Sequence, residues 1–192
     1  MSLGIDDCFG VDGAWARSVL SAPQESFGAC DLSAPFDIGR KFDLAISMEV
    51  AEHLDAERAE TFVGNITRHA DAVVFSAAAP FQGGVHHVNE QWPSYWAKKF
   101  AQQGYRCFDF LRWRLWNDRR IAVWYRQNLL IFANDGNSDL IGRLEAYDGG
   151  AGPADVIHPE IWHAVMNSKS LRLQRLVSPA LQSFRALLRK RV

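Results

Sequence analysis

The sequence has few of the features that mark an exported, membrane-spanning or disulfide-stabilised protein. Its only cysteines are Cys8, Cys30 and Cys107, and their odd number and wide spacing predict free thiols rather than a disulfide framework or a cysteine metal site. No window approaches the roughly 18 consecutive apolar residues that a membrane span needs. The N-terminus has neither the basic start nor the apolar core of an export signal. These absences predict a soluble protein of the reducing cytoplasm.

The charge and composition are those of an ordinary globular protein. Hydrophobic residues make up 48% of the sequence, charged residues make up 22%, and the formal net charge is -1. Because dedicated nucleic-acid binders carry a basic excess, this balance argues against a nucleic-acid partner. A length of 192 residues suits one domain with an appendage. The opening MSL fits an expression-vector remnant and an annotated start equally well.

Three short apolar segments near the N-terminus each end at an acidic residue. They are residues 5–11 before Asp12, residues 26–30 before Asp31, and residues 42–48 before Glu49. Apolar runs of this length predict strands. In open α/β sheets, ligands bind beyond the carboxyl ends of the strands. We therefore expect the three acids to lie at the ligand-binding edge of a sheet.

Helical and strand patterns alternate along the next part of the chain. Residues 55–69 have the spacing of an amphipathic helix capped by Asp55, and residues 71–79 form an apolar run typical of a strand buried on both faces. A second helix is predicted after Pro93 and ends near Gly104. Two further strands, 105–115 and 121–133, are predicted to form an antiparallel hairpin around the polar turn NDRR.

This alternation predicts an open, mostly parallel and twisted α/β sheet with helices on both faces and an antiparallel C-terminal hairpin. Residues 1–134 form this domain. Residues 135–157 are rich in glycine and aspartate and are predicted to be a linker with at most a weak helix at 138–146. Residues 158–192 are predicted to be a helical, basic extension. The usual behaviour of charge runs favours a helix packed on its own domain with a solvated basic face, and the alternative is binding to a membrane surface or an acidic partner.

From residue 10 to about 133 the chain resembles class I S-adenosylmethionine-dependent methyltransferases, which have a Rossmann-like sheet. The segment FDLAISMEVAEHL, residues 42–54, is similar to their fourth-strand motif, GVD at 10–12 to the end of the second strand, and CDLSAPF at 30–36 to the segment after the third. The predicted reversed last strand also matches. The resemblance implies S-adenosylmethionine as cofactor.

The resemblance also implies roles for four residues in cofactor binding. Asp12 would accept hydrogen bonds from the two ribose hydroxyls, Asp31 would meet the adenine amino group, and Leu32 would pack on the ring. Glu49 would receive the ammonium group of the methionine end. These roles suit carboxylates, which accept two hydrogen bonds side by side.

One part of the family pattern is missing from this chain. The first strand and its glycine-rich GxGxG turn should precede the ribose acid by about 20 residues. Here that acid is Asp12, and the early glycines Gly4, Gly10 and Gly13 lack the required spacing. We therefore expect either an N-terminally truncated methyltransferase or a degenerate relative. Since the missing strand would leave open sheet edges, we also expect this chain alone to form a homodimer or to bind cofactor poorly.

The loop GGVHHVNEQW, residues 83–92, contains the candidate catalytic residues His86 and His87. An imidazole there could remove a proton from an acceptor hydroxyl or amine. Alternatively, both histidines tie the loop together by hydrogen bonds. We predict no metal site, because the sequence places no further ligand near these histidines and Glu90. Glu52 and His53 are expected to start the following helix.

Aromatic residues are dense between positions 92 and 125, and Trp92 and Tyr95 adjoin the histidine loop. They could bind an acceptor, or they could belong to the core, as aromatics at such spacing often do. The predicted reaction is methyl transfer to an oxygen or nitrogen of a small-molecule or glycan-like acceptor. The alternatives are a non-catalytic binding or assembly module and another nucleotide-binding α/β protein.

Overall fold

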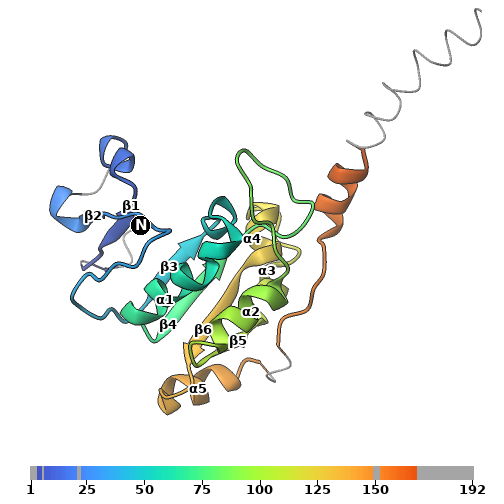
Figure 1. The fold of residues 1–192 in the computed structure, drawn as a ribbon. Helices are drawn as coiled ribbons and strands as arrows, with labels where there is room; N and C mark the ends of the chain where they lie inside the picture. The colour runs from blue at the N-terminus through green and yellow to red at the C-terminus, as the bar shows by residue number, and fades with distance from the viewer. Residues whose placement is uncertain (1–3, 6, 21–22, 149–151, 168–192) are drawn as a thin grey trace, which may run out of the picture.

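The computed structural model describes residues 4–5, 7–20, 23–148 and 152–167, and most of its strands belong to one four-stranded sheet (Figure 1). The spatial order is β3-β4-β6-β5, with β3 Ala45–Met48, β4 Ala72–Ser76, β6 Leu130–Asn134 and β5 Tyr105–Phe108. Strand β3 pairs parallel to β4, and β6 is antiparallel to both of its neighbours. Three strands therefore run one way and β6 runs the other. This confirms the predicted open, mostly parallel α/β sheet with a reversed last strand.

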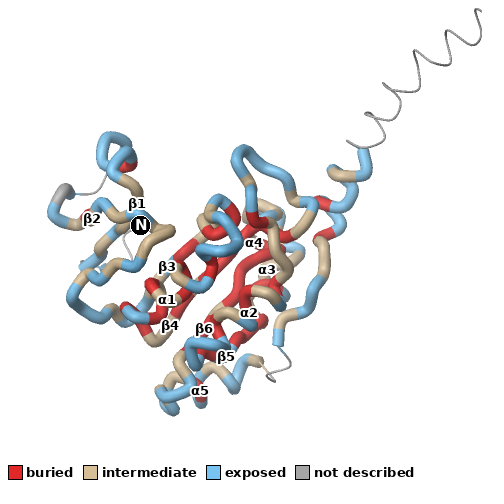
Figure 2. Tube along the Cα trace, viewed as in Figure 1, coloured by how far each residue is buried: buried red, intermediate tan, exposed pale blue. Residues whose placement is uncertain are grey.

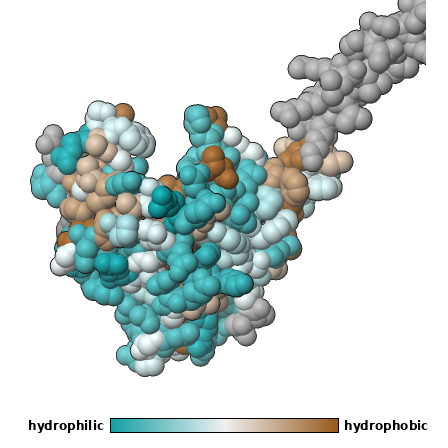
Figure 3. All heavy atoms as spheres, in the orientation of Figure 1, coloured by the Kyte–Doolittle hydropathy of each residue, from teal (hydrophilic) through white to brown (hydrophobic). Residues whose placement is uncertain are grey.

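The remaining strands, β1 Gly10–Asp12 and β2 Phe27–Ala29, form a separate parallel pair. The short helices η1 Ala14–Ser18 and η2 Gln24–Ser26 lie between them in the chain. Among the described residues no strand pairs with the outer edge of β1 or of β3. The break between the two sheets lies where the resemblance implies the missing strand. In the space-filling view a notch separates the part built on β1 and β2 from the rest of a largely hydrophilic face (Figure 3).

Helices α1 Ala59–His69 and α2 Pro93–Ala101 cover one face of the four-stranded sheet. Their apolar sides pack on alternate strand residues such as Val73 and Phe75. The Phe100 ring of α2 stacks on Phe132 of β6 with 3.8 Å between ring centroids. The buried residues therefore follow the strands (Figure 2). Helix α1 follows η4 Ala56–Arg58, and Asp55 makes no side-chain cap there.

Helix α5, Ser138–Glu145, packs on the other face of the sheet. Its Ile141 contacts Phe108 and Ala133, which point away from the first core. The side chain of Asn137 accepts a hydrogen bond from the Leu140 amide and so satisfies a free donor at the helix start. Helices on both faces are therefore observed, as predicted, and α5 lies within the segment predicted as a linker.

The predicted C-terminal hairpin is wrong in detail. Strands β5 and β6 are antiparallel, but they are short, and two helices lie between them: α3 Phe110–Leu115 and α4 Val123–Asn128. The alternation of apolar residues with arginines in FLRWRL suggested a strand. Instead, Arg112 is fully buried and pairs with Asp109, which lies one helical turn earlier. Charged residues that alternate with apolar ones usually face water on one side of a strand. Because Arg112 is buried, the alternation in this segment does not indicate a strand.

Beyond α5, residues 152–158 run past α2 and α3, and residues 159–167 are helical. The Asp155 carboxylate accepts hydrogen bonds from the Ser94 amide (2.9 Å) and hydroxyl (2.5 Å), which ties this segment to the start of α2. Most of the predicted basic extension, residues 168–192, lies outside the described residues. No described helix is both long and apolar enough to cross a membrane.

The buried hydroxyl of Tyr105 in β5 allows the packing of the core to be tested through the pH dependence of stability. Its hydroxyl contacts the carbonyl oxygens of Thr67 (2.9 Å) and Ala70 (2.8 Å), and burial, with the nearby Asp71 charge, raises its pKa to about 12. The unfolded chain loses this proton near pH 10 and the folded chain keeps it. Stability from this group is therefore complete below pH 10 and is lost as the pH rises towards 12. Urea unfolding at pH 8 and pH 11 should show a smaller loss for Tyr105→Phe than for the wild type; equal losses would contradict the assignment.

Candidate functional site

A cavity of about 770 Å³ opens at the carboxyl end of β3. Its walls come from η3 Ala51–His53, the loop 80–92 between β4 and α2, helix α4 and the helical residues 159–167. The polar residues that line it are Glu49, Glu52, His53, Gln82, His87, Glu90 and Glu160. Carboxylates and imidazoles thus dominate the polar lining of this cavity. Such a lining suits a cation or a ligand that carries donors.

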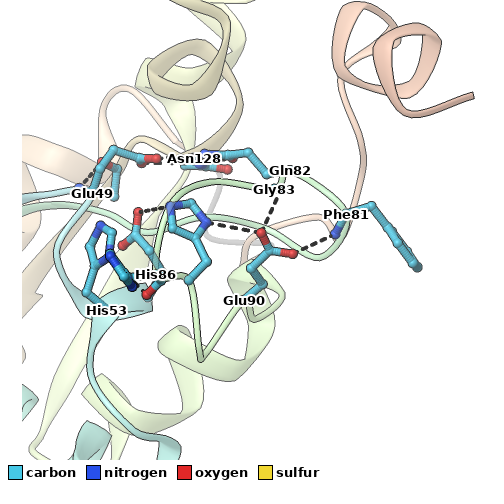
Figure 4. A network of polar contacts seen from close by, with 11 residues as sticks. Glu49, His53, Phe81, Gln82, Gly83, His86, Glu90 and Asn128 are labelled. Atoms are coloured by element: carbon cyan, nitrogen blue, oxygen red, sulfur yellow. Dashed lines mark hydrogen bonds and ion pairs between the residues drawn. The ribbon is translucent and has the colours of Figure 1, made fainter. Parts of the chain in front are cut away.

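Glu49 lies directly after β3 in a left-handed backbone conformation, with φ at 54°. Its amide donates to the Ser76 carbonyl at 2.9 Å, which fixes this turn at the end of β4. Its carboxylate accepts hydrogen bonds from Gln82 Nε2 (2.8 Å) and Asn128 Nδ2 (3.2 Å) (Figure 4). Positive φ is costly for a residue with a side chain and occurs often at functional sites. The sequence prediction that Glu49 faces a ligand site therefore fits the position of its side chain in the cavity wall.

Glu52 is completely buried, and neither of its carboxylate oxygens has a hydrogen bond of good geometry among the described residues. The main-chain amides of Glu52 itself and of Ala78 lie near enough to lower its pKa. Glu52 Oε1 lies 4.0 Å from His87 Nε2. Burial raises the pKa of Glu52 to about 7, and the negative charge of Glu49 adds to this rise. A buried carboxyl group without partners is destabilising. Its presence in a cavity wall marks Glu52 as a functional candidate.

The loop 80–92 is fixed by two sets of contacts. The main-chain carbonyl of Glu52 accepts hydrogen bonds from the Val88 amide (2.9 Å) and the Asn89 amide (3.0 Å). The Glu90 carboxylate accepts from the Phe81 amide (3.0 Å) and the Gly83 amide (2.7 Å), and contacts His87 Nδ1 at 3.1 Å (Figure 4). The His87 ring is therefore positioned against both η3 and its own loop.

The two predicted catalytic histidines are placed differently. His87 is half-buried and lines the cavity, whereas His86 is exposed and does not line it. The backbone of His86 has φ at 60°, and its carbonyl oxygen lies 3.2 Å from His53 Nδ1. The His53 and His87 rings meet edge to face, with 4.9 Å between their centroids. His86 thus contacts this site through its main chain.

Among the described residues, Glu52, His53 and His87 form a cluster in which one potential metal-ligating atom from each lies within 4.8 Å of the others. From the sequence alone no metal site is predicted, and Glu52 and His53 are expected to start a helix. Here η3 is a single turn, and its two polar residues meet the loop that carries His87. The adjacent Glu-His pair was visible in the sequence, but its distance from position 87 was not.

The predicted ribose and adenine acids lie outside this cavity. Asp31 lines a smaller hollow of about 340 Å³ together with Gly13, Ala14, Ala29 and Cys30. Its Oδ1 accepts from the Ser33 hydroxyl (2.6 Å) and amide (2.9 Å), and these bonds lower the pKa of Asp31. Asp12 accepts from the Gly13 amide at 2.7 Å, and Leu32 packs against the main core.

The predicted acceptor residues Trp92 and Tyr95 do not line the cavity. Trp92 precedes the first turn of α2, and the Tyr95 ring meets the Trp96 ring of the core. The aromatic lining comes instead from Phe81, Trp124 and Tyr125. The sequence placed the last two on a strand, whereas α4 turns them towards the cavity. No pattern in the sequence indicated that residues 160–165 complete the wall.

No protein-family model matches the sequence, and no curated protein matches it. Similar solved structures include LepI in complex with SAM, with a TM-score of 0.45 and 11% identity over 69% of this chain and 37% of that chain. The methyltransferase domain of bacterial CtHen1 has a TM-score of 0.44 and 20% identity over 67% of this chain and 77% of that domain. The glycopeptide N-methyltransferase MtfA has a TM-score of 0.39 and 10% identity over 66% and 72% of the two chains. This chain thus spans 37% of the length of the LepI structure, and at these identities nothing about activity follows.

Proposed function

We propose that this chain is an S-adenosylmethionine-dependent methyltransferase domain that methylates an oxygen or nitrogen of a small-molecule or glycan-like acceptor. The observation that carries the proposal is the position of the acids at the strand ends. Asp12 is the last residue of β1, and Glu49 directly follows β3. Asp31 follows β2 after one intervening residue. Each acid thus follows the carboxyl end of a strand, Asp12 and Asp31 in the β1-β2 pair and Glu49 in the four-stranded sheet, and open α/β sheets bind nucleotides at such strand ends.

The residues of the smaller hollow fit the adenosine half of the cofactor. Its volume of about 340 Å³ lies within the usual range for small-molecule sites, about 300–1,000 Å³. Both bonds from Ser33 go to Asp31 Oδ1, so Oδ2 can accept from an exocyclic amine. Asp12 is assigned to the ribose hydroxyls and Leu32 to the adenine face. Glu49 would hold the ammonium group of the methionine end.

When bound, S-adenosylmethionine supplies an electrophilic methyl group. The task of the protein is then to orient the acceptor and to dispose of one proton. Of the two candidate histidines, the geometry favours His87, because its ring lines the cavity and Glu90 holds Nδ1. Trp92 and Tyr95 remain proposed acceptor contacts from the sequence, and Trp124 and Tyr125 of the cavity wall are added to them.

Cofactor binding tests this proposal. Titration of the chain with S-adenosylhomocysteine, the demethylated product, should release heat, and Asp31→Asn and Glu49→Gln should each weaken binding at least about tenfold, as expected for lost charge-assisted hydrogen bonds. The exposed Asp43→Asn serves as the matched control and should leave affinity unchanged. A wild type that shows no binding would overturn the cofactor assignment and favour a non-catalytic binding module.

A second measurement tests the acceptor class. The chain is incubated with S-adenosylmethionine that carries a radiolabelled methyl group and with a cell extract separated into small-molecule and macromolecular fractions. Label is expected in the small-molecule fraction, and label in protein or nucleic acid alone would contradict the proposed acceptor.

The proposed homodimer would use the open edge of β3, where Leu44 and Ile46 are 46% and 64% exposed.

A further inference from the structure

We infer that Glu52, His53 and His87 bind a divalent transition-metal ion such as Zn²⁺ at the carboxyl end of β3. One carboxylate and two imidazoles are a ligand set that zinc and non-haem iron use in enzymes. Three protein ligands leave a coordination position open. Here the three residues all line the 770 Å³ cavity, so that position can face it.

The strongest observation is the state of the Glu52 side chain. It is fully buried, no side chain of a described residue donates a hydrogen bond to it, and its Oε1 lies 4.0 Å from His87 Nε2. The main-chain amides of Glu52 itself and of Ala78 lie near enough to lower its pKa, but they do not outweigh its burial. A buried carboxylate is normally paired with a cation or with several donors. A metal ion between Glu52 and the imidazoles would supply the missing partner.

The spacing of the three residues is close to that of a metal site. Zinc bonds of about 2.0–2.1 Å in a tetrahedral arrangement hold ligand atoms roughly 3.3 Å apart. In this structure the ligand atoms lie within 4.8 Å of one another. Side-chain movements of about 1 Å would therefore close the site. The hydrogen bonds from the Val88 and Asn89 amides to the Glu52 carbonyl keep the loop in place during that movement.

The hydrogen bonds at Nδ1 of the His53 and His87 rings favour metal binding through Nε2 of each ring. His53 Nδ1 faces a carbonyl oxygen, which can only accept, and His87 Nδ1 faces the Glu90 carboxylate. Both Nδ1 atoms therefore carry the hydrogen, and Nε2 of each ring keeps its lone pair for the metal. Histidine ligands in metal sites are usually held in this way by a carboxylate or carbonyl.

A bound ion would change the role of His87 in the proposed reaction. The ion held by Glu52, His53 and His87 would lower the pKa of an acceptor hydroxyl bound beside it, and the released proton would pass to solvent water. His87 would then hold the ion and would not act as the base. This step rests on the proposed function, whereas metal binding itself does not.

Zinc titration of the full chain tests the site directly. After treatment with EDTA and desalting, calorimetry with ZnCl₂ should show one ion per chain. Glu52→Gln and His87→Ala should each weaken binding by more than about 100-fold, because even loss of an outer partner costs about 10–100-fold. The matched control is His163→Ala, an exposed histidine that does not line the cavity, and it should bind as the wild type does.

Gly84→Ala adds a variant that keeps all three ligands. A Cβ at Gly84 would lie 2.2 Å from His87 Nε2, so the alanine must displace the ring while the backbone stays. Zinc affinity should fall at least about tenfold, and the circular dichroism spectrum should be unchanged. Visible absorption of bound Co²⁺ provides a second readout, which the same variants should weaken.

The results separate this inference from the proposed function. If the wild type binds no zinc, or if Glu52→Gln and His87→Ala bind it normally, the metal site is wrong whatever the methyltransferase assays show. If zinc binds as expected but the chain binds no S-adenosylhomocysteine, the metal site stands and the proposed function falls. Methyl transfer that survives EDTA would return His87 to the role of base.

Discussion

Replacing Arg112 by methionine is expected to lower the free energy of unfolding by about 3–5 kcal/mol. The guanidinium is completely buried, and its Nε donates to Asp109 Oδ1 at 2.7 Å. It also donates to the carbonyl oxygens of Gln127 (3.3 Å) and Ala154 (2.8 Å), and so joins α3 to α4 and to the segment that leads into residues 159–167. Methionine would leave the Asp109 charge buried with fewer donors. Urea unfolding followed by circular dichroism measures the loss.

Two variants serve as controls for this prediction. Arg120 pairs with Asp118 at the surface, where its side chain is 89% exposed, so Arg120→Met should change stability by only about 0–1 kcal/mol. The double variant Asp109→Leu/Arg112→Met removes both charges and should recover part of the loss. If Arg112→Met costs no more than Arg120→Met, the buried pair does not hold α3 and α4 together.

Replacing Glu52 by leucine is expected to stabilise the metal-free protein by about 1–3 kcal/mol while abolishing zinc binding. The reason is that the side chain is fully buried and that no hydrogen bond of good geometry with a described residue offsets its lost hydration. Leucine has a similar size and no polar atoms to desolvate. Thermal and urea unfolding in EDTA measure the gain, and calorimetry with ZnCl₂ measures the loss of the ion.

Replacing Glu90, in the same cavity, by leucine is expected to change the free energy of unfolding in the opposite direction. Its carboxylate accepts from two backbone amides and contacts His87, so its removal should destabilise the chain by about 1–3 kcal/mol. A Glu52→Leu variant that is as unstable as Glu90→Leu would mean that Glu52 has favourable partners in the folded protein. The proposed metal site would then lose its main support.

The sequence predicted the sheet better than it predicted the segments that close the cavity. The predicted strand 42–48 contains β3, because a short strand is defined by local pattern and a stop, whereas the predicted strand 5–11 overlaps β1 only at its end. The segment after Phe108 was predicted wrongly, since its alternation came from Arg112, whose burial depends on Asp109 one turn earlier and on the distant carbonyls of Gln127 and Ala154. Tertiary pairing of this kind leaves no periodic trace.

The candidate site was predicted in part for the same reason. Glu49 and His87, which were predicted as site residues, both line the cavity, because a charged residue after a strand and histidines in the following loop fall at one edge of the sheet. The burial of Glu52 could not be predicted, since a first-turn acid is usually solvated. Trp124 and Glu160 reach the cavity only because α4 and residues 159–167 fold back over it.

The two hydrogen bonds that the Val88 and Asn89 amides donate to the Glu52 carbonyl also bear on how long an ion would stay bound. The ligands Glu52 and His53 lie on the η3 side of these hydrogen bonds and His87 lies on the loop side, so His87 can leave the ion only when the loop separates from η3. The residence time of zinc would then be set by local opening rather than by the strength of any single metal bond. Amide hydrogen exchange at Val88 and Asn89 should slow on addition of zinc, and ion release should occur no faster than that opening.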